Sequence, residues 1–270
     1  MTTSRGPTRA RRPPSRPPRP DRGPAVELTV QRGVAWVTLG RPAFRNRLDA
    51  ELLGALVEVC ERLEDAEEAH VVVLAARGGA FCAGLPPGCA WPEGAWPDGI
   101  GAVARLTKPV VAAVHGDALG WGFALALACD LRVTSRAAAF ALPELEAGTL
   151  PGGGALPRLA RVVGPGRALE MALLGTRIGA AQAVAWGLVT AAVPAGRLRS
   201  TVEEMAQALA ARGPLALRLG KEAVVKALDL PLLEGIRLEH DLYVLLQTTA
   251  DRREGIGAFL ARRRPRFGAR

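Results

Sequence analysis

Two glycine-rich turns carry residues whose spacing suits chemistry on a carbonyl group. Each turn follows an apolar run of strand length: VVVLAA (71–76) leads into RGGAFCAGL (77–85), and VVAAV (110–114) leads into HGDALGWG (115–122). Glycine lets backbone N–H groups approach a ligand closely, and a helix that begins at the turn adds partial positive charge. One such turn alone would indicate only a boundary between strand and helix. If the N–H groups of both turns converged, they would form an oxyanion hole for a developing carbonyl anion.

The elements that would position these turns alternate between strands and helices. AVELTV and VAWVTL flank Gln31–Gly33 and predict a β-hairpin, and apolar residues at helical spacing predict a helix that begins after Asp49. The runs at 71–76 and 110–114 predict strands that are buried on both faces. A helix over 123–128, a strand over 131–134 and mostly helical segments beyond residue 155 complete an α/β fold. The later helices are predicted at 166–174, 180–186, 196–211, 214–227, 231–248 and 251–262.

The positive charge of the chain is concentrated at its two ends. The 270 residues carry a formal net charge of +9, of which residues 1–24 contribute seven arginines, one acid and seven prolines. Residues 261–270 contribute five arginines and no acid, so the remainder is close to neutral. A proline-rich segment with almost no apolar side chains predicts disorder over 1–24. The rest divides into an expected α/β core over 25–195 and a helical region over 196–270.

Cysteine spacing and hydropathy indicate the compartment. The four cysteines form no CxxC pair, and no apolar run reaches the ~18 residues typical of a membrane span. We therefore expect reduced thiols, a cytoplasmic protein, no metal site and no membrane partner. The first 24 residues also lack the apolar region of a secretory signal.

Six segments, in unbroken order, resemble the enoyl-CoA hydratase/isomerase family, the crotonases. They are FCAG (81–84), HGDALGWG (115–122), ACDLRV (128–133), FALPELEAGTLPGGGALPRLARVVG (140–164), GLVTAAVP (187–194) and REGIGAFLARRRPRF (253–267). The resemblance covers about residues 25–267. It implies a spiral of ββα units with a helical C-terminal trimerisation region, assembled as a homotrimer or homohexamer.

The resemblance also implies the substrate class and the site. The substrate would be an acyl-CoA thioester, with coenzyme A as part of the substrate and no further cofactor. An enolate of the thioester would be held by the backbone N–H groups of Leu85 and Trp121, although the family usually has glycine at the latter position. The remaining positions that the resemblance assigns to substrate or CoA binding are Arg45, Ala83, Gly84, Gly120, Gly122, Phe259 and Arg262.

The acidic positions distinguish the possible reactions. Hydratases of the family use two glutamates; here the first position holds Ala124 and the second holds Glu144. The additional acid of the dienoyl isomerases corresponds to Gly152. Hydration needs both an activated water and a proton donor, whereas moving a double bond between the β,γ and α,β positions needs one base. The sequence therefore favours an isomerase-type proton shift by Glu144.

Two alternatives remain open at this point. A replacement acid, either Glu93 or Asp98 from the unusual segment 85–101 or Asp117 from the second turn, would make the enzyme a hydratase. A crotonase-fold protein that has lost catalysis would instead bind nucleic acid through its basic ends. Because no aromatic residue interleaves the arginines of 1–24, no nucleic-acid partner is expected. His115 and Cys82 are expected to be structural.

Overall fold

The computed structural model describes residues 23–86, 88–89 and 96–268. The predicted tail over 1–24 lies outside the described residues apart from Gly23 and Pro24. Glu93, one of the possible replacement acids, also lies outside them.

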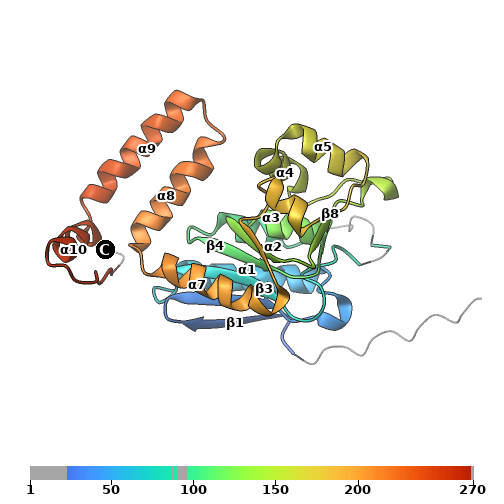
Figure 1. The fold of residues 1–270 in the computed structure, drawn as a ribbon, viewed down its shortest axis with the longest axis horizontal. Helices are drawn as coiled ribbons and strands as arrows, with labels where there is room; N and C mark the ends of the chain where they lie inside the picture. Colours follow the sequence, from blue (N-terminus) through green and yellow to red (C-terminus); the bar gives the residue numbers. More distant parts are fainter. Residues whose placement is uncertain (1–22, 87, 90–95, 269–270) are drawn as a thin grey trace, which may run out of the picture.

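A six-stranded sheet forms the centre of the α/β part, in the order β1-β2-β3-β4-β6-β9. The first two strands pair antiparallel as the predicted hairpin, and the following neighbours pair in parallel. Figure 1 shows this sheet with helices on both sides. The strands are β1 (Val26–Gln31), β2 (Val34–Leu39), β3 (Val71–Ala76), β4 (Val110–Val114), β6 (Leu131–Ser135) and β9 (Ala191–Val193).

The central strands are apolar on both faces because each face is covered. On β3, Val72 and Leu74 belong to the main core, whereas Val71 and Val73 belong to a second core that includes residues of α7 (Leu198–Ala210). This alternation explains why the run at 71–76 has no polar position within its first four residues. The continuous apolar strands of the sequence therefore belong to a sheet with two packed faces.

Ten α-helices lie in the described residues. The helix α1 begins after Asp49 as predicted, since the Asp49 side chain accepts a hydrogen bond from the Leu52 N–H at 2.9 Å. Two helices, α2 and α4, were not predicted from the sequence. Besides α7, the helices are α1 (Ala50–Asp65), α2 (Gly99–Arg105), α3 (Trp121–Leu127), α4 (Ala155–Val163), α5 (Pro165–Leu173), α6 (Ala180–Ala185), α8 (Pro214–Ala227), α9 (Leu232–Gln247) and α10 (Ala250–Leu260).

A second sheet of three strands lies next to the glycine turns. It consists of β5 (Asp117–Leu119), β7 (Ala139–Ala141) and β8 (Ile178–Gly179), with β5 parallel to β7 and β7 antiparallel to β8. Cys82 of the first glycine turn forms an isolated parallel bridge with Ala118 of β5. This small sheet therefore ties the first turn to the second.

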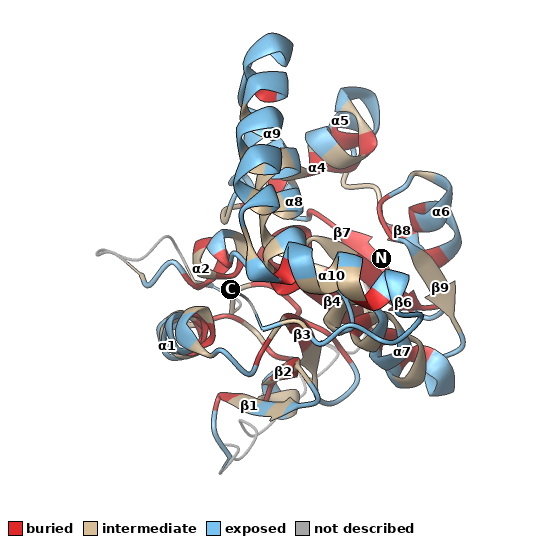
Figure 2. Ribbon diagram, turned by 90° about the vertical axis from the view of Figure 1, so that its left-hand side faces the viewer, coloured by how far each residue is buried: buried red, intermediate tan, exposed pale blue. Residues whose placement is uncertain are grey.

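The last three helices extend away from the sheets. In Figure 1, α8 and α9 form an antiparallel pair that projects to one side, and α10 lies at its far end. Figure 2 shows that most of α9 is exposed. Its exposed side chains include large apolar ones, among them Leu232, Leu233 and Ile236. Among the described residues, no helix has the length and apolar character needed to cross a membrane.

Candidate active site

The structure brings the two glycine turns into direct contact. The Cys82 N–H donates to the Asp117 carbonyl and the Leu119 N–H donates to the Cys82 carbonyl, each at 3.0 Å. A Cβ atom added at Gly84 would lie 2.9 Å from the Leu119 carbonyl oxygen and 3.8 Å from the Trp121 nitrogen. The absence of a side chain at Gly84 therefore allows the first turn to lie against the start of α3.

Both predicted N–H donors lie at this junction. Trp121 is the first residue of α3, where N–H groups have no partner within the helix. Leu85 follows Gly84 and is half-buried, and its N–H bonds to no backbone carbonyl among the described residues. The neighbouring positions are also tightly packed, since a Cβ atom at Gly122 would lie 2.2 Å from the Cys82 carbonyl oxygen.

Glu144 projects into the same junction from the segment between β7 and the short 3₁₀ helix Leu145–Ala147. A Cβ atom at Gly120 would lie 1.8 Å from the Glu144 Oε1 atom, so only glycine allows this approach. The Trp121 N–H donates a hydrogen bond to the Glu144 carboxylate. The predicted base and one predicted oxyanion donor are therefore in contact.

Burial dominates the electrostatics of Glu144. Desolvation raises the pKa of its carboxyl group above the ordinary value, and hydrogen bonds from the Glu144 and Trp121 backbone lower it by less. The Oε2 atom is buried and has no hydrogen-bond partner in the described structure. An unpaired buried carboxylate oxygen is unfavourable in its charged form, which acts in the same direction as the raised pKa.

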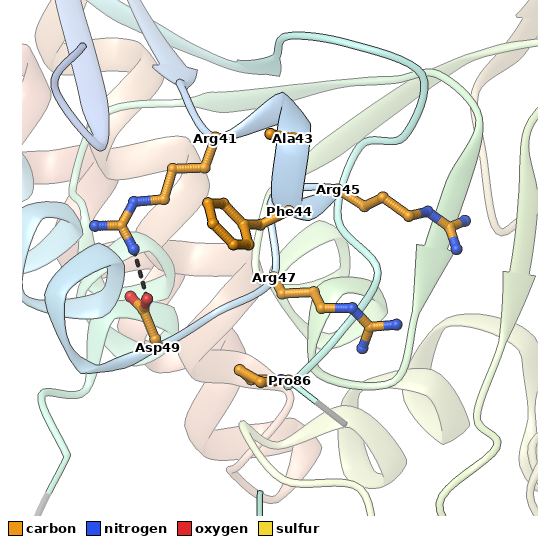
Figure 3. A pocket seen from close by; sticks show the side chains of 7 residues that line it. All are labelled: Arg41, Ala43, Phe44, Arg45, Arg47, Asp49 and Pro86. Atoms are coloured by element: carbon orange, nitrogen blue, oxygen red, sulfur yellow. Dashed lines mark hydrogen bonds and ion pairs between the residues drawn. The ribbon is translucent and has the colours of Figure 1, made fainter. Parts of the chain in front are cut away.

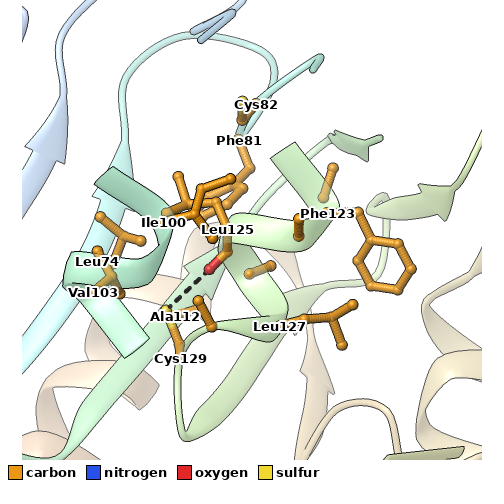
Figure 4. Packing of buried hydrophobic residues seen from close by; sticks show 14 of the residues in the cluster. Leu74, Phe81, Cys82, Ile100, Val103, Ala112, Phe123, Leu125, Leu127 and Cys129 are labelled. Carbon is orange, nitrogen blue, oxygen red and sulfur yellow. Dashed lines mark hydrogen bonds between the residues drawn. The ribbon is translucent and has the colours of Figure 1, made fainter. Parts of the chain in front are cut away.

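The position of the first hydratase glutamate is apolar. Ala124 is fully buried, and a Cβ atom at Gly153 would lie 3.2 Å from the Ala124 Cβ and 2.5 Å from the Ile100 Cδ1. Figure 4 shows Ile100 of α2 packed among core side chains that include Phe81 and Leu125. In the described part of the chain, this side of the site therefore presents methyl groups where the other side presents a carboxylate.

The possible replacement acids that can be located are engaged elsewhere. Asp98 caps α2 by accepting from the Gly101 N–H at 2.8 Å, and it pairs with Arg105 at 2.9 Å. Asp117 pairs with Arg45 through one oxygen and with Arg177 through the other. These contacts leave neither carboxylate positioned as the partner of Glu144.

A cavity of about 320 Å³ opens next to the first turn, lined by three arginines together with Phe44, Asp49 and Pro86. Figure 3 shows Arg41 directed toward Asp49, whereas the Arg45 and Arg47 side chains extend away from it. Arg41 pairs with two carboxylates and Arg45 with one. Arg47 pairs with no carboxylate among the described residues; it donates to the Leu85 carbonyl.

Arg47 is the residue of this cavity that sequence reasoning did not single out. Burial lowers the pKa of its guanidinium, and the positive charge of Arg45 lowers it further. A half-buried cation without a carboxylate partner favours the binding of an anion in the cavity. Its presence in the turn RPAFRNRL, which holds Arg45, was the available signal. The same turn contacts Ala83, whose N–H donates to the Arg45 carbonyl at 3.0 Å.

The remaining predicted residues lie apart from this junction or have structural contacts. His115 forms a hydrogen bond with the Gly78 carbonyl at 2.9 Å, and burial raises the pKa of the Cys82 thiol to about 12. Phe259 is 82 % exposed on α10, which lies far from α3 in Figure 1. Arg262 was expected on the last helix, but it follows the end of α10 with a φ of 51°.

Comparisons with known proteins bear on the family and the fold. A model of the family "Enoyl-CoA hydratase/isomerase" matches residues 29–270. The chain is 37 % identical to the putative enoyl-CoA hydratase/isomerase YngF of Bacillus subtilis, covering 90 % of this chain and 97 % of that protein. It is 35 % identical to the 1,2-epoxyphenylacetyl-CoA isomerase of Escherichia coli, covering 88 % and 96 %. The crystal structure of an enoyl-CoA hydratase from Bacillus anthracis superposes with a TM-score of 0.87 at 32 % identity, covering 91 % and 100 %.

The fold and the matched length define an α/β crotonase-fold enzyme with C-terminal helices, as the sequence predicted. The chain belongs to the enoyl-CoA hydratase/isomerase family, whose members act on acyl-CoA thioesters. The relatives include proteins named as hydratases and as isomerases, so kinship alone does not select the reaction.

Proposed function

We propose that this enzyme moves a double bond within an enoyl-CoA thioester, using Glu144 as its single acid–base group. The observation that carries the proposal is the contrast between a buried carboxylate at Glu144 and the methyl group of Ala124 where a hydratase has its other glutamate. One base suffices for a proton shift, but addition of water also requires a second group to activate the water or deliver the proton.

The step begins with the thioester carbonyl oxygen between the Leu85 and Trp121 N–H groups. The Glu144 carboxylate removes a proton from C2 of a 3-enoyl-CoA, and the electron pair spreads into a dienolate whose oxygen the two N–H groups stabilise. The protonated Glu144 then delivers the same proton to C4. The double bond moves from C3–C4 to C2–C3, and Glu144 returns to its ionised form. No water or redox partner enters the balance.

The position of Glu144 supports this role. Its Oε2 atom is buried and unpaired, so it can receive a proton without first breaking a contact. Its raised pKa brings the carboxyl group closer to neutrality, which suits a residue that must both take and return a proton. Backbone donors require no particular side chain, so Leu85 and Trp121 serve as well as smaller residues.

The coenzyme A portion of the substrate is proposed to enter through the arginine-lined cavity. Arg47 supplies a charge that no described carboxylate neutralises, and phosphate groups are natural partners for guanidinium. Arg45 has a weaker claim than the sequence suggested, because Asp117 already neutralises it. The backbone at Ala83 and Gly84 and at Gly120 and Gly122 would form the walls beside the thioester.

Assembly into a homotrimer or homohexamer also belongs to the proposal. Its support is the exposed apolar surface of α9, together with Phe259 and Arg262 at the end of the chain. Side chains of this kind are commonly covered by another subunit. Since α10 lies far from α3 within one chain, Phe259 and Arg262 would contact CoA in a neighbouring subunit's site.

Substitution of Glu144 tests the reaction. We expect isomerisation of 3-hexenoyl-CoA to exceed hydration of 2-hexenoyl-CoA in the native enzyme, and Glu144→Gln to reduce isomerisation by at least ~10²-fold. Because both N–H donors remain, binding of acyl-CoA esters should persist. Glu146→Gln is the matched control, since Glu146 is exposed two residues further along the same segment.

Two outcomes would contradict the proposed reaction. Hydration that exceeds isomerisation and depends on Glu93, Asp98 or Asp117 would establish the hydratase alternative. Isomerisation that survives Glu144→Gln would remove Glu144 from the mechanism.

A further inference from the structure

The side chain of Trp121 is held firmly beside the reacting centre. A Cβ atom at Gly152 would lie 2.2 Å from the Trp121 Cζ2 and 2.5 Å from its Cε2, so the indole ring lies directly against this glycine. On another side, the ring meets Trp96 edge to face, with centroids 6.4 Å apart and an interplanar angle of 67°. The residue is only 9 % exposed. The ring therefore occupies a defined place in the packed structure.

The ring is also close to the atoms that would react. The Trp121 N–H contacts the Glu144 carboxylate and would also bind the proposed thioester oxygen. The indole ring is attached to the same residue and therefore lies near both groups. Trp121 and Ala124 are three positions apart in α3 and hence share one face of the helix. The Ala124 methyl group faces Gly153 and Ile100. With the thioester placed as proposed, an acyl chain that extends along this face would meet the indole and then this closed apolar surface.

We propose that Trp121 limits the length of the acyl group, so that the enzyme selects short-chain acyl thioesters of roughly four to six carbons. The proposal rests on the proposed function for the location of the thioester, but it adds a substrate class. A longer chain must displace a buried ring from its contacts with Trp96 and Gly152, or leave its end in water. A chain end left in water lacks the roughly fourfold increase in affinity that burial of each methylene would give.

Saturated acyl-CoA esters test the length limit without requiring turnover. Isothermal titration calorimetry would measure the Kd of butyryl-, hexanoyl-, octanoyl- and decanoyl-CoA for the native enzyme, Trp121→Ala and Trp121→Phe. The native enzyme should show no gain in affinity beyond hexanoyl-CoA. Trp121→Ala should bind longer esters progressively better than the native enzyme does, reaching at least ~10-fold for decanoyl-CoA, and Trp121→Phe should give an intermediate gain.

Trp36→Ala is the control for the loss of a tryptophan. Trp36 packs with the second core, on the opposite face of the main sheet, where its ring lies under Arg199. This variant should keep the chain-length profile of the native enzyme. If the native affinity increased steadily to decanoyl-CoA and Trp121→Ala had the same slope, the length limit would be wrong. If the native enzyme bound none of the four esters, the proposed function itself would fail.

Discussion

The two sides of the candidate site differ in what they can exchange with a ligand. On one side, Glu144 presents a buried carboxylate with one unpaired oxygen. On the other, Ala124, Ile100 and Gly153 lie so close together that a single added methyl group would clash. The space that a glutamate side chain at position 124 would need is filled by these apolar groups. One side of the site therefore holds an ionisable group, whereas the other is closed by apolar packing.

Restoring the missing glutamate should test that packing most strongly. We expect Ala124→Glu to lower the free energy of unfolding by about 3 kcal/mol or more, because a carboxyl group would be forced into a filled apolar space. Chemical denaturation measures the loss. The variant should gain no hydration of crotonyl-CoA, since no space remains for the water.

Two further variants separate charge from size at this position. Ala124→Gln has the same length without the ionisable group, so a smaller loss than in Ala124→Glu would measure the effect of charge. Ala124→Glu combined with Ile100→Ala opens the space and should recover part of the stability. If Ala124→Glu alone were as stable as the native protein and hydrated crotonyl-CoA, the space around position 124 would not be filled as described.

Ionisation of Glu144, on the polar side of the site, should determine how the rate of isomerisation depends on pH. The Glu144 carboxyl group has a raised pKa and must be ionised to remove a proton. The rate of isomerisation at low substrate concentration should therefore fall about tenfold for each pH unit below that pKa. The midpoint should lie above the ordinary value for glutamate. A rate that stayed constant down to the ordinary value would mean that Glu144 is not the base.

The smallest effect concerns the stability of the resting enzyme. Because the folded state raises the pKa of Glu144, it holds the proton more tightly than the unfolded state does. The group therefore opposes folding increasingly as the pH rises through this pKa, and it contributes no penalty well below the ordinary value. Glu144→Gln should accordingly raise the Tm at pH 7 by about 2 °C and leave it unchanged near pH 3, well below the ordinary value. An equal shift at both pH values would contradict this account.

The sequence predicted the parts that depend on local pattern. The hairpin Val26–Leu39 and the helix capped by Asp49 follow from alternation, turn residues and capping chemistry. The contact between Trp121 and Glu144 was accessible only through the resemblance, because residues this far apart in sequence share no local signal. Fold and family were therefore accessible before the structure was.

Other features depend on contacts that a linear pattern does not encode. The short helix α2 was missed although Asp98 is its N-cap, since glycine and proline dominate the preceding residues. The pairing of Asp117 with Arg45 and Arg177 joins three distant segments, so no local pattern indicated that a possible replacement acid and a predicted CoA ligand contact each other. Arg47 differs from Arg41 and Arg45 only in the structure, where those two pair with carboxylates and Arg47 pairs with none among the described residues.

Under the proposed mechanism, the hydrogen bond from the Trp121 N–H to the Glu144 carboxylate makes the basicity of Glu144 depend on whether substrate is bound. In the ligand-free protein this bond is one of the contacts that hold the pKa of Glu144 down. A thioester oxygen that takes the Trp121 N–H for itself deprives the carboxylate of that contact. The base then becomes stronger at the moment the carbon acid arrives, and it is held weaker while the site is empty. The same backbone N–H would thus bind the Glu144 carboxylate in the empty site and the enolate oxygen during the reaction.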